Sequence, residues 1–330
     1  ALLLLFVKKP EDIIIYAVII SFIVFLNNII SYIYVKRRIK FNFKDLKLLQ
    51  YIKPLFLVLI LTNVEILYSQ LDRLLLGKFV SDVSVTQYYI PYYLISMLAS
   101  IPYSIINVSI PRLSYIAKAE GQASYEKTLR VAVSSLLFII IPMCFGVAVL
   151  SKEVVFLYAG DKYENITATL VLACIIRIII SIESVLTNLV LYVNNKEKII
   201  VRFSFIFGIA NLIMDSLLIF FNILTPFSAM LTTGIAELAL ITTQYLYIKN
   251  KMNMKISLFT SQNLTYLILS ICFIPIAYIV KKIDFGFYIN IVIIMALCMT
   301  LYAGVLLLRK DESIYVIVNK VTNKLKLKKE

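Results

Sequence analysis

The sequence predicts an all-α, polytopic membrane protein, and three observations carry that prediction. Hydrophobic residues make up 61% of the 330 residues and charged residues 16%, whereas soluble domains average about 45–50% and 25%. The mean hydropathy is +0.90. Apolar stretches of about 20 residues, long enough to cross a ~30 Å hydrocarbon core as helices, recur along the chain.

Two neighbouring apolar stretches, residues 54–80 and 87–113, carry the features around which the rest of the chain is organised. The first places Glu65, Asp72 and Arg73 within membrane depth, and the second holds a run of tyrosines and three prolines. An uncompensated charge costs roughly 3 kcal/mol or more at the centre of a spanning helix. The first stretch is therefore expected to have a functional role.

Further spanning helices are predicted on both sides of this pair. They cover about residues 13–35, 131–150, 166–193, 199–221, 227–248, 264–280 and 287–308. Residues 1–7 are expected to be the tail of another spanning helix, which makes the chain N-terminally incomplete. The connection at 114–130 is expected to be the most soluble loop. Residues 311–330 predict either a basic amphipathic helix or a solvated tail.

The distribution of basic residues predicts the topology. Alternate connections hold 24 and 7 of the 33 Lys and Arg residues, and the remaining two lie inside spans. This alternating bias is the positive-inside pattern, so the richer set and the C-terminus are predicted to be cytoplasmic. The net charge of +14 is therefore expected to face anionic membrane lipids and not nucleic acid.

Residue types also limit the chemistry. The chain has no histidine, and each of its four cysteines stands alone in an apolar stretch. This excludes Ser-His and Cys-His catalysis and any histidine-containing zinc site. No nucleophile and base converge in a recognisable pattern. The sequence therefore predicts that the protein is not an enzyme and needs no cofactor or bound metal.

Four more charged residues lie at membrane depth: Arg177, Glu183, Asp215 and Glu237. One interpretation is that Arg177 pairs with an acid only to hold helices together. The other is a water-filled cavity that receives an anionic or polar headgroup, with a carboxylate available for protons or cations. Two interpretations also remain open for the arginine and the tyrosines of the two organising stretches. Arg73 either contacts substrate or snorkels to the interface, and Tyr88 and Tyr92 either stack on sugars or anchor the helix.

Residues 71–114 resemble two helices of the Wzx-type polysaccharide flippases, in the multidrug/oligosaccharidyl-lipid/polysaccharide exporter superfamily. The shared features are Asp72-Arg73, Gly77, the tyrosines from Tyr88 to Tyr93, and Pro111-Arg112-Leu113. A second similar stretch, residues 154–172, corresponds to an extracytoplasmic loop of that family. The resemblance covers nearly the whole chain in topology.

The resemblance implies a two-lobe, alternating-access exporter. The layout it implies is 1–35 as the end of the first helical lobe, 36–53 as a basic cytoplasmic linker, 54–250 as the second six-helix lobe, 251–310 as two further transmembrane helices and 311–330 as a basic cytoplasmic tail. It places the protein in a bacterial cytoplasmic (inner) membrane.

The implied substrate is an undecaprenyl-diphosphate-linked oligosaccharide repeat unit, moved outward for capsule, O-antigen or exopolysaccharide assembly. The substrate-binding candidates are Arg73, Arg177, Asp72, Tyr88 and Tyr92. The coupling or cavity candidates, which would serve H⁺ or Na⁺, are Glu65, Glu183, Asp215 and Glu237. A polysaccharide polymerase complex is the expected protein partner.

Other functions share parts of this pattern. Lipid II flippases and cation-coupled multidrug antiporters have the same fold with a different cavity. A multispan polysaccharide polymerase would be an enzyme, but such proteins usually carry a sizeable extracytoplasmic loop or an Asp-rich cytoplasmic site. The sequence shows neither.

The predicted topology can be tested by labelling. A single cysteine placed near Lys328 is expected to resist an impermeant thiol reagent in intact cells and to react after the membrane is opened, because the C-terminus is predicted to be cytoplasmic. Labelling from outside intact cells would contradict the topology.

Overall fold

The structure is a computed structural model. It describes residues 9, 12–38, 49, 51, 52, 55, 56, 70–254, 256–258 and 260–315, without the side chains of residues 162 and 164. The chain divides into two compact units, Ala1–Phe56 and Leu57–Glu330. Each unit is described separately.

The first unit contains α2 (Ile13–Lys36), a helix of 24 residues. At ~1.5 Å rise per residue it is about 36 Å long, enough to span a bilayer. Its last turn is basic and aromatic. The ammonium of Lys36 lies 5.7 Å from the Tyr32 ring centroid, and the Arg38 guanidinium lies 4.5 Å from that of Tyr34. Such rings and cations suit a membrane–water interface.

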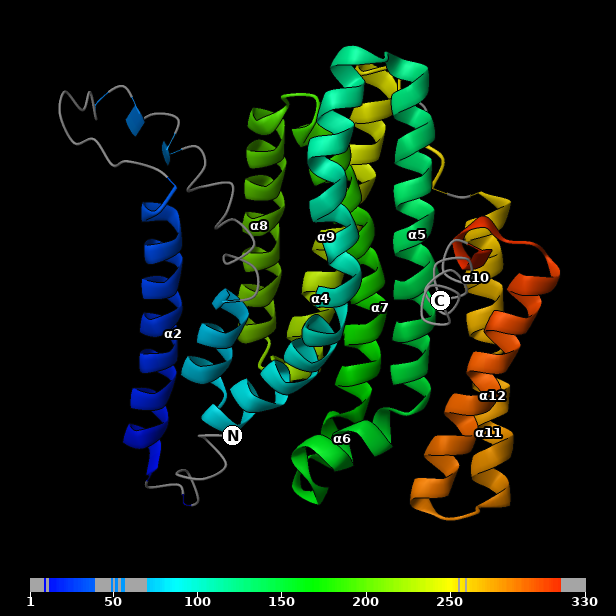
Figure 1. Cartoon of the computed structure of the whole chain (residues 1–330). Helices are drawn as coiled ribbons and strands as arrows, with labels where there is room; N and C mark the ends of the chain where they lie inside the picture. Colours follow the sequence, from blue (N-terminus) through cyan, green and yellow to red (C-terminus); the bar gives the residue numbers. More distant parts are fainter. Residues whose placement is uncertain are drawn as a thin grey trace. The chain divides into compact units, whose positions relative to one another are not determined.

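The second unit is a helical bundle (Figure 1). After a helical segment at residues 70–79 come α4 (Asp82–Ala119), α5 (Gln122–Val149), α6 (Ser151–Ala159), η2 (Asp161–Ile166), α7 (Thr167–Ser184), η3 (Val185–Tyr192), α8 (Glu197–Phe220), α9 (Pro226–Lys251), α10 (Ser261–Ile271), α11 (Phe273–Ile283) and α12 (Phe287–Leu308). Across the described residues, seven helices or joined helix pairs are long and apolar enough to cross a membrane. The predicted class, a polytopic helical membrane protein, is confirmed.

The helix α9 differs from the other predicted spans. It has 26 residues, but it is not among the seven apolar spans found in the described residues. Its hydropathy is lowered by polar side chains that it buries, including Thr233, Glu237 and Gln244. The helix packs against α7 and α8, so its polar face contacts protein.

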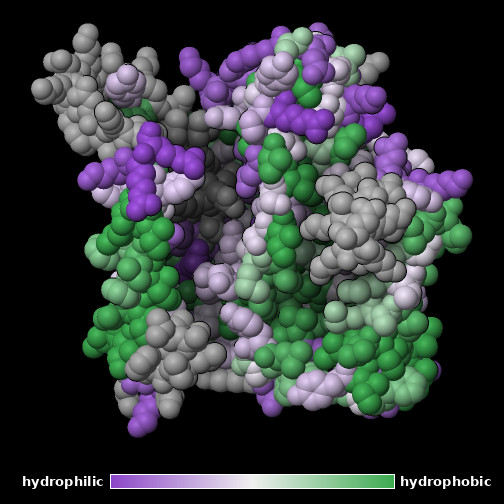
Figure 2. All heavy atoms as spheres, in the orientation of Figure 1, coloured by the Kyte–Doolittle hydropathy of each residue, from purple (hydrophilic) through white to green (hydrophobic). Residues whose placement is uncertain are grey.

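The predicted loop at 114–130 is mostly helical. The helix α4 continues to Ala119 and α5 begins at Gln122, with Gly121 in the turn at φ +83°. The expectation of a long loop is therefore wrong, because both helices extend past the apolar stretches that predicted them. Figure 2 shows hydrophilic residues gathered where α4 and α5 meet.

Figure 1 shows α4 curving along its length. This helix contains three prolines, each of which removes a backbone hydrogen bond and favours a bend.

The core of the second unit lies between α4, α5 and the α7–η3 pair. Leu136 and Ile140 on α5 and Leu186 and Leu189 on η3 are fully buried. The η3 segment is a π-helix, and the Tyr125 hydroxyl donates a 2.6 Å hydrogen bond to the Leu189 carbonyl within it. This contact satisfies a backbone acceptor in a segment whose hydrogen-bond pattern departs from the α-helix.

The predicted span at 264–280 forms two joined helices, α10 and α11, which meet at Cys272. Lys281 on α11 forms a salt bridge of 2.7 Å to Glu153 on α6. Figure 2 shows hydrophobic residues over α11 and α12, as expected for helices that face lipid. Of the C-terminal segment 311–330, residues 312–315 are helical. The expected amphipathic helix beyond them lies outside the described residues.

Gly234 sets the spacing between α7 and α9. A Cβ atom at this position would lie 2.9 Å from Cγ1 of Ile176, closer than side chains normally approach. We expect Gly234→Ala to lower the free energy of unfolding by about 1–3 kcal/mol, the usual effect of overpacking.

Three of the four cysteines are buried, so a thiol-reactive dye can report unfolding as temperature rises. The double variant Gly234→Ala/Ile176→Val should recover part of the loss, because it removes Cδ1 of Ile176, one of the two atoms that the added Cβ would meet. An unchanged melting temperature in Gly234→Ala would contradict the close packing.

Candidate functional site

The centre of the site is the carboxyl group of Asp72, which is fully buried. Its Oδ2 atom accepts hydrogen bonds from the Tyr88 hydroxyl at 2.5 Å and from Thr233 Oγ1 at 2.7 Å. Its Oδ1 atom accepts from Asn211 Nδ2 at 3.2 Å. These partners come from α4, α9 and α8, so one carboxyl group joins three helices to its own.

A second buried carboxyl group, that of Asp215 on α8, lies against the first. Its Oδ1 atom accepts a 2.6 Å hydrogen bond from Thr232 Oγ1. Within the described residues, Oδ2 of Asp215 and Oδ1 of Asn211 have no hydrogen-bond partner although both are buried. Both orphaned atoms are acceptors, and the ligand that satisfies two acceptors is a cation or a proton.

The helices that carry the site residues begin at well-defined caps, and the site residues lie at similar distances from the helix ends. Thr225 and Ser228 form a capping box at the start of α9, with Pro226 in the first turn. The Ser81 hydroxyl caps α4 by accepting from the Ser84 N–H at 3.1 Å. Tyr88, Asp215 and Thr232 lie five or six residues from the nearer end of their helices, which is about 8–9 Å. The site therefore sits in the half of the bundle predicted to face outward.

The ligand set suits a small hard cation. Two carboxyls, two threonine hydroxyls and an amide supply oxygen atoms within a water-poor interior, and hard cations prefer oxygen ligands. Two adjacent carboxylates cannot both stay charged without such a cation or a shared proton. In the described part of the chain no three His, Cys, Asp or Glu side chains cluster as metal ligands. Two carboxylates would balance a divalent cation, whereas one carboxylate beside one carboxylic acid would balance a monovalent cation such as Na⁺.

The second part of the site is Arg177 on α7, which is buried. Its Nη2 atom donates to Ser96 Oγ on α4, and its guanidinium carbon lies 5.4 Å from the centroid of the Tyr92 ring. Arg177 lines a small cavity of about 10 Å³ together with Tyr88 and Thr233. Both of these side chains donate hydrogen bonds to Asp72, so Arg177 faces two of the groups that bind the buried carboxyl.

The other predicted coupling residues occupy different places along the bundle. Glu183 lies farther along α7 than Arg177 and accepts hydrogen bonds from Thr187 Oγ1 and from Gln244 Nε2, the latter at 3.2 Å. Glu237 is buried on α9. Glu65 lies outside the described residues.

The tyrosines lie on two faces of α4, and Arg73 of the preceding helical segment lies near one of these faces. Tyr88 is buried against Asp72, whereas Tyr89 and Tyr93 are exposed and stack with their ring centroids 5.5 Å apart. The Arg73 guanidinium carbon lies 5.0 Å from the Tyr89 centroid. Tyr88 thus binds a carboxyl group inside the bundle and is not at the surface, where a sugar ring or the interface would meet it.

Sequence reasoning named both carboxyl groups but missed their polar ligands. Asn211 is four residues before Asp215, and residues at that spacing share a helix face. Thr232 and Thr233 precede Gly234, the point where α9 approaches α7. These patterns could have pointed to a shared site, but pairing α8 with α9 required the tertiary structure.

With this geometry described, comparison with known proteins gives two findings. A model of the family described as "Polysaccharide biosynthesis protein" matches residues 12–168. The solved structure described as "Lipid II flippase MurJ, inward closed conformation" matches with a TM-score of 0.61 and 19% sequence identity. The chain has the flippase fold.

The structural match covers 82% of this chain and 58% of the MurJ chain, so this chain spans less than two thirds of that protein's length. No curated protein matches the chain. The two findings together confirm the resemblance to flippases of the exporter superfamily.

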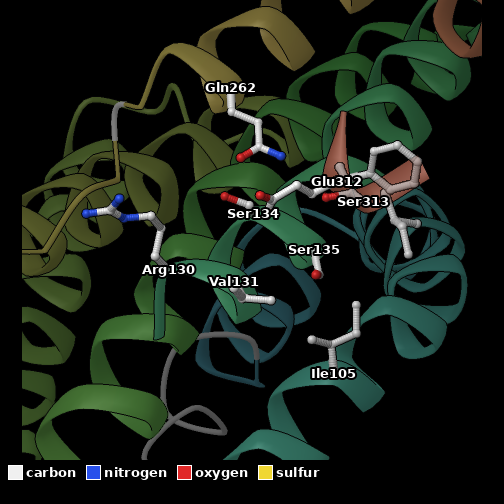
Figure 3. A pocket seen from close by; sticks show the side chains of 10 residues that line it. Ile105, Arg130, Val131, Ser134, Ser135, Gln262, Glu312 and Ser313 are labelled. Atoms are coloured by element: carbon white, nitrogen blue, oxygen red, sulfur yellow. The ribbon is translucent and has the colours of Figure 1, made fainter. Parts of the chain in front are cut away.

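Another pocket of the bundle lies apart from the carboxyl site. It has a volume of about 310 Å³ and is lined by residues of α4, α5, α10 and the segment after α12. Figure 3 shows Ser134 and Ser135 at its centre, with Arg130 and Glu312 on opposite sides. Ser134 donates to Asn263 Oδ1 at 2.9 Å, so part of its polar surface is already satisfied by protein.

The cation interpretation predicts a stabilising effect of Na⁺ that needs Asp215. Binding at 100 times the Kd would stabilise the folded state by about 2.7 kcal/mol. In Asp215→Asn, which keeps the shape and removes a charge, this gain should disappear when melting temperatures in Na⁺ and choline salts are compared.

Asp161→Asn is the matched control, because Asp161 is exposed and far along the chain from the carboxyl pair. It should keep the full effect of Na⁺. Equal stabilisation of wild type and Asp215→Asn would rule out Na⁺ binding at this site.

Proposed function

We propose that the chain belongs to a flippase that moves undecaprenyl-diphosphate-linked oligosaccharide repeat units across the bacterial cytoplasmic membrane by alternating access. The observation that carries this proposal is the buried Arg177, which shares a small cavity with Tyr88 and Thr233, two donors to the buried Asp72 carboxyl, inside a bundle with the flippase fold. The match to a polysaccharide biosynthesis family supports this substrate class. The product would serve capsule, O-antigen or exopolysaccharide assembly.

The proposed role of Arg177 is to bind the diphosphate. Guanidinium groups match phosphate oxygens in charge and in geometry, and a buried one binds more strongly because water competes less. Arg73, with its guanidinium over Tyr89, is the second proposed contact. It lies on a more exposed face, where an acidic sugar or the outgoing headgroup could reach it.

The proposed coupling ion is Na⁺, held by Asp72 and Asp215. The site gathers carboxyl, hydroxyl and amide oxygens around two acceptors that have no hydrogen-bond partner in the described structure, and this oxygen set supports a cation. A proton shared by the two carboxyls is the alternative. Alternating access needs a free-energy difference between its two states, and differential binding of an ion supplies it. Glu183 and Glu237 would line the route between the two membrane faces.

In this proposal residues 54–250 form the second lobe, 1–35 end the first, and 36–53 link them on the cytoplasmic side. Residues 251–310 add two transmembrane helices, and the tail 311–330 lies in the cytoplasm. A polysaccharide polymerase complex on the outer side would take up the translocated repeat unit.

Deletion of the gene in the source cell tests the function. The expected result is accumulation of undecaprenyl-linked repeat units inside the cell together with loss of surface polymer. Accumulation of lipid II would favour a lipid II flippase instead. Unchanged glycan with altered sensitivity to small cationic compounds would favour a multidrug antiporter.

Complementation of that deletion tests Arg177. Arg177→Ala should lower surface polysaccharide at least about tenfold, because the loss of a buried charged hydrogen bond to phosphate is worth about 1.5–3 kcal/mol. The amount of protein in the membrane should stay normal by immunoblot.

The matched control is Arg202→Ala, which removes an exposed arginine from α8 and should complement fully. Normal polymer from Arg177→Ala at normal expression would remove Arg177 from the mechanism.

A further inference from the structure

We propose that Tyr88 and Tyr92 are positioning residues that link occupancy of the Asp72–Asp215 site to the placement of the Arg177 guanidinium. The inference rests on the proposed function, because it takes the carboxyl pair as the ion site and Arg177 as the diphosphate contact. It adds a physical connection between the two and names the side chains that make it.

The connection is a continuous series of contacts along one face of α4. The Tyr88 hydroxyl donates to Asp72 Oδ2 at 2.5 Å. The Tyr88 and Tyr92 rings are stacked, with centroids 6.3 Å apart and planes 15° apart. Arg177 lies over Tyr92 and donates to Ser96. Residues 88, 92 and 96 are spaced by four, so they share a helix face.

A change of charge at Asp72 acts first on the Tyr88 hydroxyl. Against a carboxylate this hydrogen bond is charge-assisted and strong. A cation bound to the carboxyl group draws on the same oxygen lone pairs and weakens the bond. The other groups that face the pair are Asn211, Thr232 and Thr233. Tyr88 contacts Asp72 directly, and its ring also stacks on Tyr92, the ring that lies against the Arg177 guanidinium.

The surroundings leave the rings little freedom to absorb a shift. Tyr88 is 1% exposed, and its buried neighbours in the same apolar cluster include Ile95 and Ile176. The adjoining cavity holds about 10 Å³, about the space of one water molecule. Closely packed interiors transmit small displacements because they have few alternative arrangements. A movement of the Tyr88 ring must therefore displace Tyr92, on which the guanidinium of Arg177 rests.

A matched pair of rings on the same helix lacks this connection. Tyr89 and Tyr93 also stack, but both are exposed, and no described hydrogen bond ties either ring to the carboxyl pair. Tyr93 therefore provides a control substitution of the same residue type, one position along from Tyr92.

The experiment measures binding of farnesyl diphosphate, a short isoprenyl diphosphate, to the purified full chain in lipid nanodiscs. The dissociation constant is determined in saturating Na⁺ and in choline. In wild type we expect the two values to differ by at least about fivefold, within the range typical of coupled sites. By linkage, the diphosphate should change the Na⁺ affinity by the same factor.

Three variants locate the coupling. Tyr88→Phe removes the hydroxyl alone, and Tyr92→Leu removes the second ring. Both should reduce the coupling factor to less than about twofold, whatever their effect on the affinity for either ligand alone. Tyr92→Phe, which keeps the ring, and the control Tyr93→Leu should retain the wild-type factor. Melting temperatures read with the thiol-reactive dye identify any variant that fails to fold.

The outcomes separate the inference from the function on which it rests. Full coupling in Tyr88→Phe and Tyr92→Leu would mean that the two sites interact directly through space, which overturns the tyrosine connection and leaves the flippase proposal intact. Wild-type binding of both ligands without coupling would overturn the connection in the same way. A wild type that binds no isoprenyl diphosphate would overturn both proposals.

Discussion

Burial of the Asp72 carboxyl group constrains the half of the second unit that contains the starts of α4 and α9. A carboxylate in a membrane interior is stable only when donors or a cation surround it. The donors here come from α4, α8 and α9, so the helices cannot separate or rotate without leaving a charge unsatisfied. The binding site and the packing of the bundle are thus the same set of contacts. An ion bound to this carboxyl group, as proposed above, would therefore act directly on the positions of these helices.

The buried polar groups of the bundle lie at three successive positions along its length. The acceptor-rich carboxyl site lies near one end, and the buried Arg177 lies deeper along α7. The cluster of Glu183, Thr187 and Gln244 is farther still. Opposite charges at different depths give a transporter separate places for a cation and for an anionic headgroup. Helix α4 touches the first two through one face, because Tyr88 and Ser96 are two turns apart on it.

The sequence was sufficient for the membrane class and for naming the charged residues, because apolar length and isolated charges are local properties. Asp72, Asp215 and Arg177 were all identified from their position in apolar stretches. Their grouping was not predictable, because Asp72 and Asp215 lie 143 positions apart and nothing local pairs their helices. The long loop expected at 114–130 was wrong for a related reason. Apolar content marks where a helix crosses the bilayer, whereas α4 and α5 continue beyond it.

The modest hydropathy of α9 affects how this helix inserts into the membrane during synthesis. A helix that carries Glu237, Gln244 and paired threonines gains little free energy from entering lipid alone, since each charged residue near the centre opposes insertion by about 2.5–3.5 kcal/mol. Neighbouring helices α7 and α8 cover its polar face. Membrane integration of α9 therefore depends on helices synthesised before it. Substitutions on their facing surfaces would affect biogenesis of the protein before they affect any transport step.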